Sequence, residues 1–393
     1  MPVINRIADF HADMTEWRRD LHTHPELALH ETRTSAVVAE KLRAFGVDEV
    51  HTGIATTGVV GVIHGSEPGP PGAGIGLRAD MDALPIHEET GLPYASQTPG
   101  AMHACGHDGH TSMLLGAARY LAETRNFAGK AYVIFQPAEE NLGGAGIMVK
   151  EGLFDRFPMT QVFGMHNWPD VPEGVFQWRN GPIMAAVANI EIDIAGRGAH
   201  GAQPHQGIDP IVVAAAIVQA LQSIVARNVE PMESGVVTIG SIQGGHIYNV
   251  IPDTVRMLGT ARWFAPEVGD ILEHGVKQLA TSIAQGFGAT AKVLFQRTYP
   301  ATVNDPDAMA MALRAAKEVQ GPARVEPMRK PSMGGEDFSF MLNAKQGAYI
   351  MLGGRRSPDE VMVHHPKYDF NDALLPIGAS YYATLIEQLL PRN

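Results

Sequence analysis

Residues 187–299 follow the order strand, helix, strand, strand, helix, strand, and this block constrains the fold more than any other feature of the chain. Its first strand, "VANIEIDIAG" (187–196), alternates isoleucines with polar residues, which is typical of a strand with one face in water. Helices are expected at 209–226 and 267–288, and the other strands at 235–242, 254–264 and 291–299. Because this order is that of a self-contained ferredoxin-like unit, we predict an inserted domain.

The segments on both sides of this block alternate strands with helices. The opening segment reads as helix up to about Phe45; strands are expected at 58–65, from 75, at 131–136, 161–168 and 348–354, and helices at 112–123, 306–320 and 379–390. Such alternation favours an α/β domain with a largely parallel sheet. A chain of 393 residues also exceeds what one hydrophobic core usually holds. We therefore predict a discontinuous main domain, residues 1–182 and 299–393, and a lid or dimerisation domain, residues 183–298.

Charge and hydropathy limit the partners of the chain. Its 42 acidic and 30 basic side chains give a net charge of −12, which disfavours nucleic acid and anionic membranes as partners. The first 35 residues contain no apolar core of the signal-peptide type, and the most apolar window, 211–221, is shorter than the roughly 20 residues that span a bilayer. A single cysteine suits a reducing compartment. The expected location is the cytoplasm.

The stretch "MHACGHDGHT" (102–111) contains the only cysteine of the chain, Cys105, two positions before His107. In an extended loop, residues at this spacing point to the same side. A thiolate and a neutral imidazole both bind divalent metals. Taken singly, however, a free cysteine is more often a small buried side chain, and a loop histidine more often has no special role.

Further candidate ligands lie where predicted strands end, and in a parallel sheet ligands bind beyond those ends. Each is weak evidence alone, since a pair of glutamates is most often a solvated turn and a strand-terminal histidine is more often structural. The candidates are Asp80 and Asp82, Glu139 and Glu140 in "PAEE", His166 before a proline, and His364 and His365 in "VHHPKYDFND".

Together these segments offer five ligands: Cys105, His107, one glutamate, His166 and one histidine of the last pair. A catalytic zinc ion takes only three protein ligands, so five fit better around two metal ions about 3.5–4 Å apart that share a water, with or without a shared protein ligand. The other glutamate is then available as a general base. The residues alone leave open which glutamate and which histidine have these roles.

A series of motifs resembles, in order and spacing, the hippurate hydrolase and N-acyl-amino-acid amidohydrolase branch of the aminoacylase-like di-metal metallopeptidases. The resemblance covers nearly the whole chain, and such an ordered series is far more specific than any one motif. The motifs are "RRDLHTHPELALHETRTS", "LRADMDALP", "HACGHDGHT", "FQPAEE", "GMHNWP", "GAHGAQPHQGIDPI", "NVIPDTVRMLGTAR", "MGGEDFSFML" and "HHPKYDFND".

This resemblance implies an aminopeptidase-like di-metal catalytic domain interrupted by a lid, and roles for individual residues. By resemblance, the metal ligands would be Cys105, His107, Glu140, His166 and His364, and Glu139 the base. Relatives elsewhere in the superfamily have His-x-Asp where this chain has Arg78 and Asp80. Arg78 cannot bind a metal, and Asp80 is expected to orient a ligating histidine from behind. His200 resembles the lid histidine that reaches the reacting carbonyl across a dimer interface, although without the resemblance it would be a solvated loop residue.

The resemblance also implies the reaction, in which N-acyl amino acids are hydrolysed to a carboxylic acid and a free amino acid. Two divalent metal ions, zinc or manganese first and cobalt or nickel as alternatives, would activate a water while Glu139 takes its proton. Asn249 and Arg262 are suggested as donors to the substrate carboxylate, although a surface charge is an equally good interpretation of Arg262. A homodimer or homotetramer formed through the lid domain is expected.

Two other functions remain open. The same site would suit a di-metal aminopeptidase or dipeptidase, but that function needs an acidic group for a free substrate amine, and no motif identifies one. A non-catalytic homologue that binds a metabolite would be expected to have lost a ligand or the base, whereas Glu139 and all five expected ligands are present. A covalent serine mechanism is disfavoured because the chain has no Gly-x-Ser-x-Gly motif.

Overall fold

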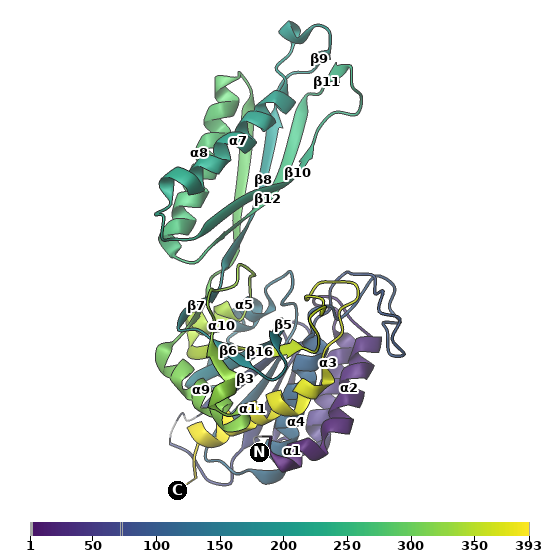
Figure 1. Ribbon diagram of the computed structural model, residues 1–393, viewed down its shortest axis with the longest axis vertical. Coiled ribbons are helices and arrows are strands. Elements are labelled where there is room, and N and C mark those ends of the chain that lie inside the picture. The colour runs from purple at the N-terminus through teal and green to yellow at the C-terminus, as the bar shows by residue number, and fades with distance from the viewer. Residues whose placement is uncertain (1–2, 71, 73, 393) are drawn as a thin grey trace. The chain divides into compact units, whose positions relative to one another are not determined.

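The computed structural model describes residues 3–70, 72 and 74–392, and the chain divides into two compact units (Figure 1). Unit 1 comprises Met1–Ile183, Thr302–Pro331 and Glu336–Asn393. Unit 2 comprises Met184–Ala301 and the short segment Ser332–Gly335. The expected insertion was 183–298, so the structure adds to unit 2 a segment that comes from the later part of the chain.

Unit 1 contains an eight-stranded sheet in the order β1-β2-β4-β3-β5-β16-β6-β15. The four strands β4, β3, β5 and β16 run parallel, whereas β1 and β2 at one end, and the pairing of β16 with β6, are antiparallel. The strands are β1 Glu49–Ile54, β2 Gly58–His64, β3 Gly74–Asp80, β4 Lys130–Gln136, β5 Gln161–Pro172, β6 Phe176–Trp178, β15 Val325–Pro327 and β16 Gln346–Arg355. β7 (Gly181–Met184) and β14 (Thr302–Asn304) form a separate pair.

Helices cover this sheet, and its central strands are therefore buried. Every residue of β3 is buried, and residues of α3, α4, α9 and α11 share one hydrophobic core with the sheet. α5 and α10 pack against each other. The helices of unit 1 are α1 Asn5–Asp9, α2 His11–Thr23, α3 Thr32–Ala44, α4 His107–Thr124, α5 Gly144–Lys150, α6 Leu153–Arg156, α9 Pro306–Gln320, α10 Ser339–Ala344 and α11 Leu375–Leu389, with short 3-10 turns at Pro322–Arg324 and Asp372–Leu374.

Unit 2 is a four-stranded antiparallel sheet in the order β10-β12-β8-β13 with two helices. Its elements are β8 Ala186–Ala195, β9 Ala199–His200, α7 Pro210–Asn228, β10 Gly235–Gln243, β11 Val250–Ile251, β12 Thr254–Trp263, α8 Pro266–Gly286 and β13 Thr290–Tyr299, with a 3-10 turn at Pro204–Gln206. The predicted ferredoxin-like order is confirmed, with the small β9–β11 pair added to it.

α7 extends beyond the apolar window noted in the sequence. By length and composition alone, the helix Pro210–Asn228 could cross a membrane. One such helix is weak evidence for a membrane span, because core helices of other proteins pass the same test. Its Val213, Ile217 and Leu221 are fully buried in the core of unit 2. The apolar residues of this face therefore serve packing within the unit.

Two local expectations were wrong. The segment up to Phe45 is not one helix but α1, α2 and α3, because the chain leaves the helix at His24, directly before Pro25, and proline restricts its predecessor to extended conformations. The strand expected to end at Pro169 continues to Pro172 as β5. Its pairing with β16 shifts register between Gly353 and Arg355, which accommodates the prolines.

Candidate metal centre

The predicted ligands come together beyond the carboxyl ends of the parallel strands of unit 1. Cys105 and His107 lie on either side of Gly106, where the chain enters α4. Gly106 has φ 93°, and a Cβ atom there would lie 2.5 Å from Oδ1 of Asn167, so the turn requires glycine. Glu140 follows β4, His166 lies within β5, and His364 lies in the loop after β16.

The ligand atoms form two groups that share Cys105. The potential ligand atoms of Cys105, His107 and His166 lie within 4.8 Å of one another, and so do those of Cys105, Glu140 and His364. Sγ of Cys105 lies 3.4 Å from Nε2 of His166. Nε2 of His364 lies 3.4 Å from Oε1 of Glu140. The two groups together would suit a pair of divalent cations.

Unpartnered buried atoms show that this site fits a cation. Nε2 of His107 and Oε1 of Glu140 are buried, and among the described residues neither has a hydrogen-bond partner. Although burial disfavours the charged imidazole, the carboxylates of Asp80 and Asp82 raise the pKa of His107 to about 10. Burial, followed by the charge of Glu140, raises the pKa of the Cys105 thiol well above its ordinary value. The acidic surroundings thus favour a positive charge, which a bound metal would supply while converting the thiol to thiolate.

The backbone at His364 separates the two adjacent histidines. His364 has φ 66°, in the left-handed region, and its N–H donates to the carbonyl oxygen of Ala104 at 2.7 Å. Nδ1 of His365 instead accepts from the N–H of Lys367 at 3.1 Å. Of the two histidines, only His364 belongs to a group of potential metal ligands among the described residues.

Glu139 lies beside the ligands in a buried position. Its carboxylate shares a group with His107 and Glu140 in which the ligand atoms lie within 4.8 Å. Burial, followed by the charges of Glu336 and Glu140, raises the pKa of Glu139 well above its ordinary value. A carboxylate with raised proton affinity next to a cation site is suited to general base catalysis.

Comparison with known proteins identifies the family. A model described as Peptidase family M20/M25/M40 matches residues 76–388. The chain belongs to this family. It is 42% identical over 385 residues to the hippurate hydrolase of Campylobacter jejuni, covering 98% of both chains, and 40% identical over 366 residues to the N-acetyl-L-cysteine deacetylase of Bacillus subtilis, covering 93% of this chain and 85% of the relative.

A solved M20 structure is similar over its full length. The YXEP protein of Bacillus subtilis, described as a dinuclear metal-binding peptidase from the M20 family, has a TM-score of 0.82 at 35% identity, covering 98% of this chain and 99% of its own. The predicted α/β fold with an inserted domain is thereby confirmed, as are the predicted branch and the enzyme class, a metal-dependent amidohydrolase.

Asp82 of this M20 protein orients His107, which the sequence analysis did not foresee. Nδ1–H of His107 lies 2.9 Å from the carbonyl oxygen of Asp82 and 3.2 Å from its Oδ1. The other carboxylate oxygen of Asp82 accepts from the N–H of Glu140 at 3.0 Å. Asp80, which was expected to orient a ligating histidine, lies 3.7 Å from Nε2 of His107 and hydrogen-bonds Nδ1 of His110 at 2.6 Å. The second aspartate of "RADMD" was the only sequence signal for this contact.

We expect Asp82→Ala to weaken metal binding by roughly 10- to 100-fold, because it removes the carboxylate contacts to one predicted ligand and to the backbone of another. Titration of the metal-free protein against a chromogenic chelator measures this change. Asp48→Ala is the matched control, since Asp48 also accepts a backbone N–H, that of His64, but in an exposed position away from the site. Equal metal affinity in the two variants would contradict the assignment.

The three predicted residues of unit 2 lie in two different places, His200 and Asn249 at the small β9–β11 pair and Arg262 in the four-stranded sheet. His200 lies on β9 opposite Val250, and the N–H of Gly201 donates to the carbonyl oxygen of Asn249 at 2.7 Å, so His200 and Asn249 are neighbours. Arg262 lies near the end of β12, opposite Val187. Its guanidinium bonds Thr260 and, at 3.0 Å, the carbonyl oxygen of Ala261.

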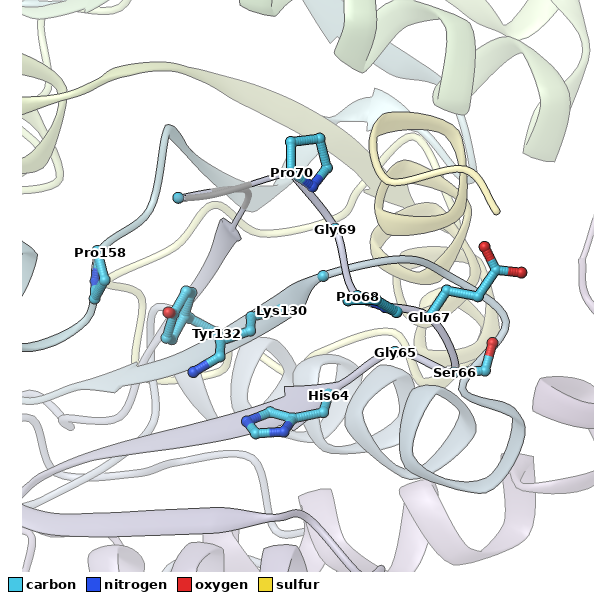
Figure 2. Close-up of a pocket in the computed structure, with 12 residues that line it drawn as sticks. His64, Gly65, Ser66, Glu67, Pro68, Gly69, Pro70, Lys130, Tyr132 and Pro158 are labelled. Atoms are coloured by element: carbon cyan, nitrogen blue, oxygen red, sulfur yellow. The ribbon is translucent and has the colours of Figure 1, made fainter. Parts of the chain in front are cut away.

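One pocket in unit 1 is lined by none of the proposed metal ligands. It has a volume of about 580 Å³, and Figure 2 shows His64, Lys130 and Tyr132 beside the connection that contains Pro68 and Pro70. Lys130 is the first residue of β4, so the pocket lies at the amino end of that parallel strand. Ligands of such sheets bind at the carboxyl ends, where the candidate metal centre lies.

Proposed function

We propose that the protein hydrolyses the amide bond of N-acyl amino acids with two divalent metal ions, releasing a carboxylic acid and a free amino acid. The observation that carries this proposal is a buried glutamate, Glu139, next to two groups of metal-ligating side chains that share Cys105. The names of the relatives, hippurate hydrolase and N-acetyl-L-cysteine deacetylase, support this substrate class.

In the proposed site, Cys105, His107, Glu140, His166 and His364 would hold the two cations. Bound there, they would lower the pKa of a water and polarise the substrate carbonyl. Glu139 takes the proton of the attacking water and passes it to the leaving amine as the carbon–nitrogen bond breaks, so that neither proton nor charge is left over. Burial, followed by the charge of His110, lowers the pKa of His166 well below its ordinary value and keeps the ring neutral. Its Nδ1–H donates to the carbonyl oxygen of Asn167 at 2.6 Å, which fixes the ring and leaves Nε2 toward Cys105.

The finer assignments belong to the same proposal. A thiolate among imidazoles favours zinc, while the carboxylate ligand and open positions admit manganese, and then cobalt or nickel. A homodimer or homotetramer formed through unit 2 would bring His200 of one subunit to the carbonyl in another. The excess of acidic residues and the substrate class fit an enzyme of the cytoplasm.

Asn249 and Arg262 of one chain are too far apart to bind one carboxylate. Thr254, which follows Asn249 in the chain, lies eight residue steps from Arg262 along β12, which corresponds to roughly 26 Å. We therefore expect Asn249→Ala and Arg262→Ala to differ, with a several-fold rise in KM for an N-acyl amino acid only in the variant that has lost a carboxylate donor. Steady-state kinetics measure this, and two unchanged KM values would remove both residues from the site.

A panel of substrates tests the proposed function. Wild-type protein loaded with manganese, zinc, cobalt or nickel is assayed with hippurate, N-acetyl amino acids and an unblocked dipeptide. Turnover of the acylated compounds with little cleavage of the dipeptide is expected. The reverse preference would indicate a dipeptidase, and a metal-replete protein inert toward the whole panel would indicate a binding protein.

A further inference from the structure

The segment that carries the base and one ligand is held by buried carboxylates. This segment, Pro137–Gly143, connects β4 to α5 and contains Glu139 and Glu140. Three carboxylates accept backbone N–H groups in and next to it: Glu31 from Ala138 at 2.9 Å, Asp82 from Glu140 at 3.0 Å, and Asp337 from Ala145 at 2.9 Å. Ala138 has φ 55°, an unfavourable conformation for alanine, so the surrounding contacts must enforce this bend.

Within the described part of the chain, Asp337 differs from the other two carboxylates. It alone has hydrogen bonds to both ends of the segment and to Glu139. Its carboxylate oxygens each lie 2.8 Å from Nε2 of Gln136, the last residue of β4, and one of them accepts from Ala145 in α5. Its own N–H donates to Oε1 of Glu139 at 3.3 Å. One residue therefore fixes the segment and contacts the proposed base.

Arg78 holds Asp337 in this orientation. The guanidinium is fully buried and donates to Asp337 at 3.0 Å, to Glu336 at 2.9 Å and to Oε1 of Gln136 at 2.8 Å. A buried guanidinium with several carboxylate partners is rigid, because its planar fork fixes the direction of each hydrogen bond. Arg78 cannot bind a metal, and these contacts give it a different task in unit 1.

We propose that Asp337 is a positioning residue for Glu139 and that Arg78 keeps Asp337 in place. This inference rests on the proposed function, in which Glu139 is the base. Within the described residues, the carboxylate of Asp337 accepts hydrogen bonds from the N–H of Ala145, the amide of Gln136 and the guanidinium of Arg78. An asparagine there would turn an NH2 group toward one of them and loosen the segment.

The test compares Asp337→Asn with wild type and with the matched variant Asp305→Asn. Asp305 also accepts backbone N–H groups, those of Asp307 and Ala308 at the start of α9. For Asp337→Asn we expect kcat to fall about 10- to 100-fold, because small displacements of a catalytic group have effects of this size. KM and the number of bound metal ions should stay as in wild type. Asp305→Asn should keep wild-type kcat.

Hydrogen exchange gives a readout that does not depend on activity. In metal-free protein, peptides covering 136–147 should exchange faster in Asp337→Asn than in wild type or Asp305→Asn. Should Asp337→Asn fail to fold, Arg78→Lys, which keeps the charge but loses the fork, undergoes the same measurements with the same expected direction. The proposal would be overturned if the folded variant had wild-type kcat or unchanged hydrogen exchange. It would also be overturned if kcat fell only because the variant had lost bound metal. If the wild type hydrolyses none of the panel, the proposed function fails, and exchange alone decides whether Asp337 holds the segment.

Discussion

Glu139→Gln is expected to lower kcat by roughly 10²- to 10⁴-fold, the usual contribution of a positioned general base. Glutamine has nearly the same shape as glutamate but cannot accept the proton of an attacking water. Since the proposed ligands do not include Glu139, metal content and KM should change little. Steady-state kinetics with the best substrate of the panel, together with metal analysis of the same sample, measure both quantities.

Glu173→Gln is a suitable control for this variant. Glu173 is exposed and accepts from Nδ2 of Asn371 at 2.8 Å, so the same chemical change is made away from the metal centre. Its kcat should equal that of wild type. If Glu139→Gln kept more than a tenth of wild-type kcat, the base would lie elsewhere, and if it lost a metal ion, Glu139 would be a ligand.

Cys105→Ala is expected to remove at least one of the two bound metal ions and to lower hydrolysis by more than about 10³-fold, because activation of the water depends on the cations. The reason is geometric: Cys105 belongs to both groups of potential ligands, whereas His166 and His364 each belong to one. Elemental analysis per subunit and activity after addition of each metal are the measurements. Removal of the metals from wild type with a chelator should abolish activity reversibly.

His365→Ala provides the contrast for the ligand set. His365 is adjacent to His364 in the sequence but lies outside the described groups of metal-ligating residues. This variant should keep both metals and near-wild-type activity, while His364→Ala should behave like Cys105→Ala. Full metal content in Cys105→Ala would contradict the shared role of the sulfur.

Much of the fold could be predicted because hydrophobic patterns report local structure. The alternation around Ile190, Ile192 and Ile194 predicted β8, and all three residues are buried. α7 and α9 both begin at a proline, and the preceding aspartates, Asp209 and Asp305, cap their first turns. The small β9–β11 pair was missed because a two-residue strand has no periodicity to detect.

The residues of the candidate site could be predicted where their chemistry and the order of the motifs indicate a metal site. Cys105, His107 and Glu139 are examples, because thiol, imidazole and carboxylate groups are common in such sites. The roles of Asp82, Glu31 and Asp337 did not emerge, because hydrogen bonds to backbone N–H groups leave no spacing pattern: Glu31 is 107 residues from its partner Ala138, and Asp337 is 192 residues from Ala145. The choice of His364 over His365 depends on the left-handed backbone conformation of His364, which the residue types in this loop do not predict.

The position of β16 in the sheet has a consequence for biosynthesis. β16 lies between β5 and β6, yet it is synthesised only after the whole of unit 2. Until then the nascent chain exposes an open edge of β5, a hazard for aggregation, and Asp337 and His364 do not yet exist to complete the centre. The proposed metal centre can therefore be completed only late, once the part of the chain around His364 has been made.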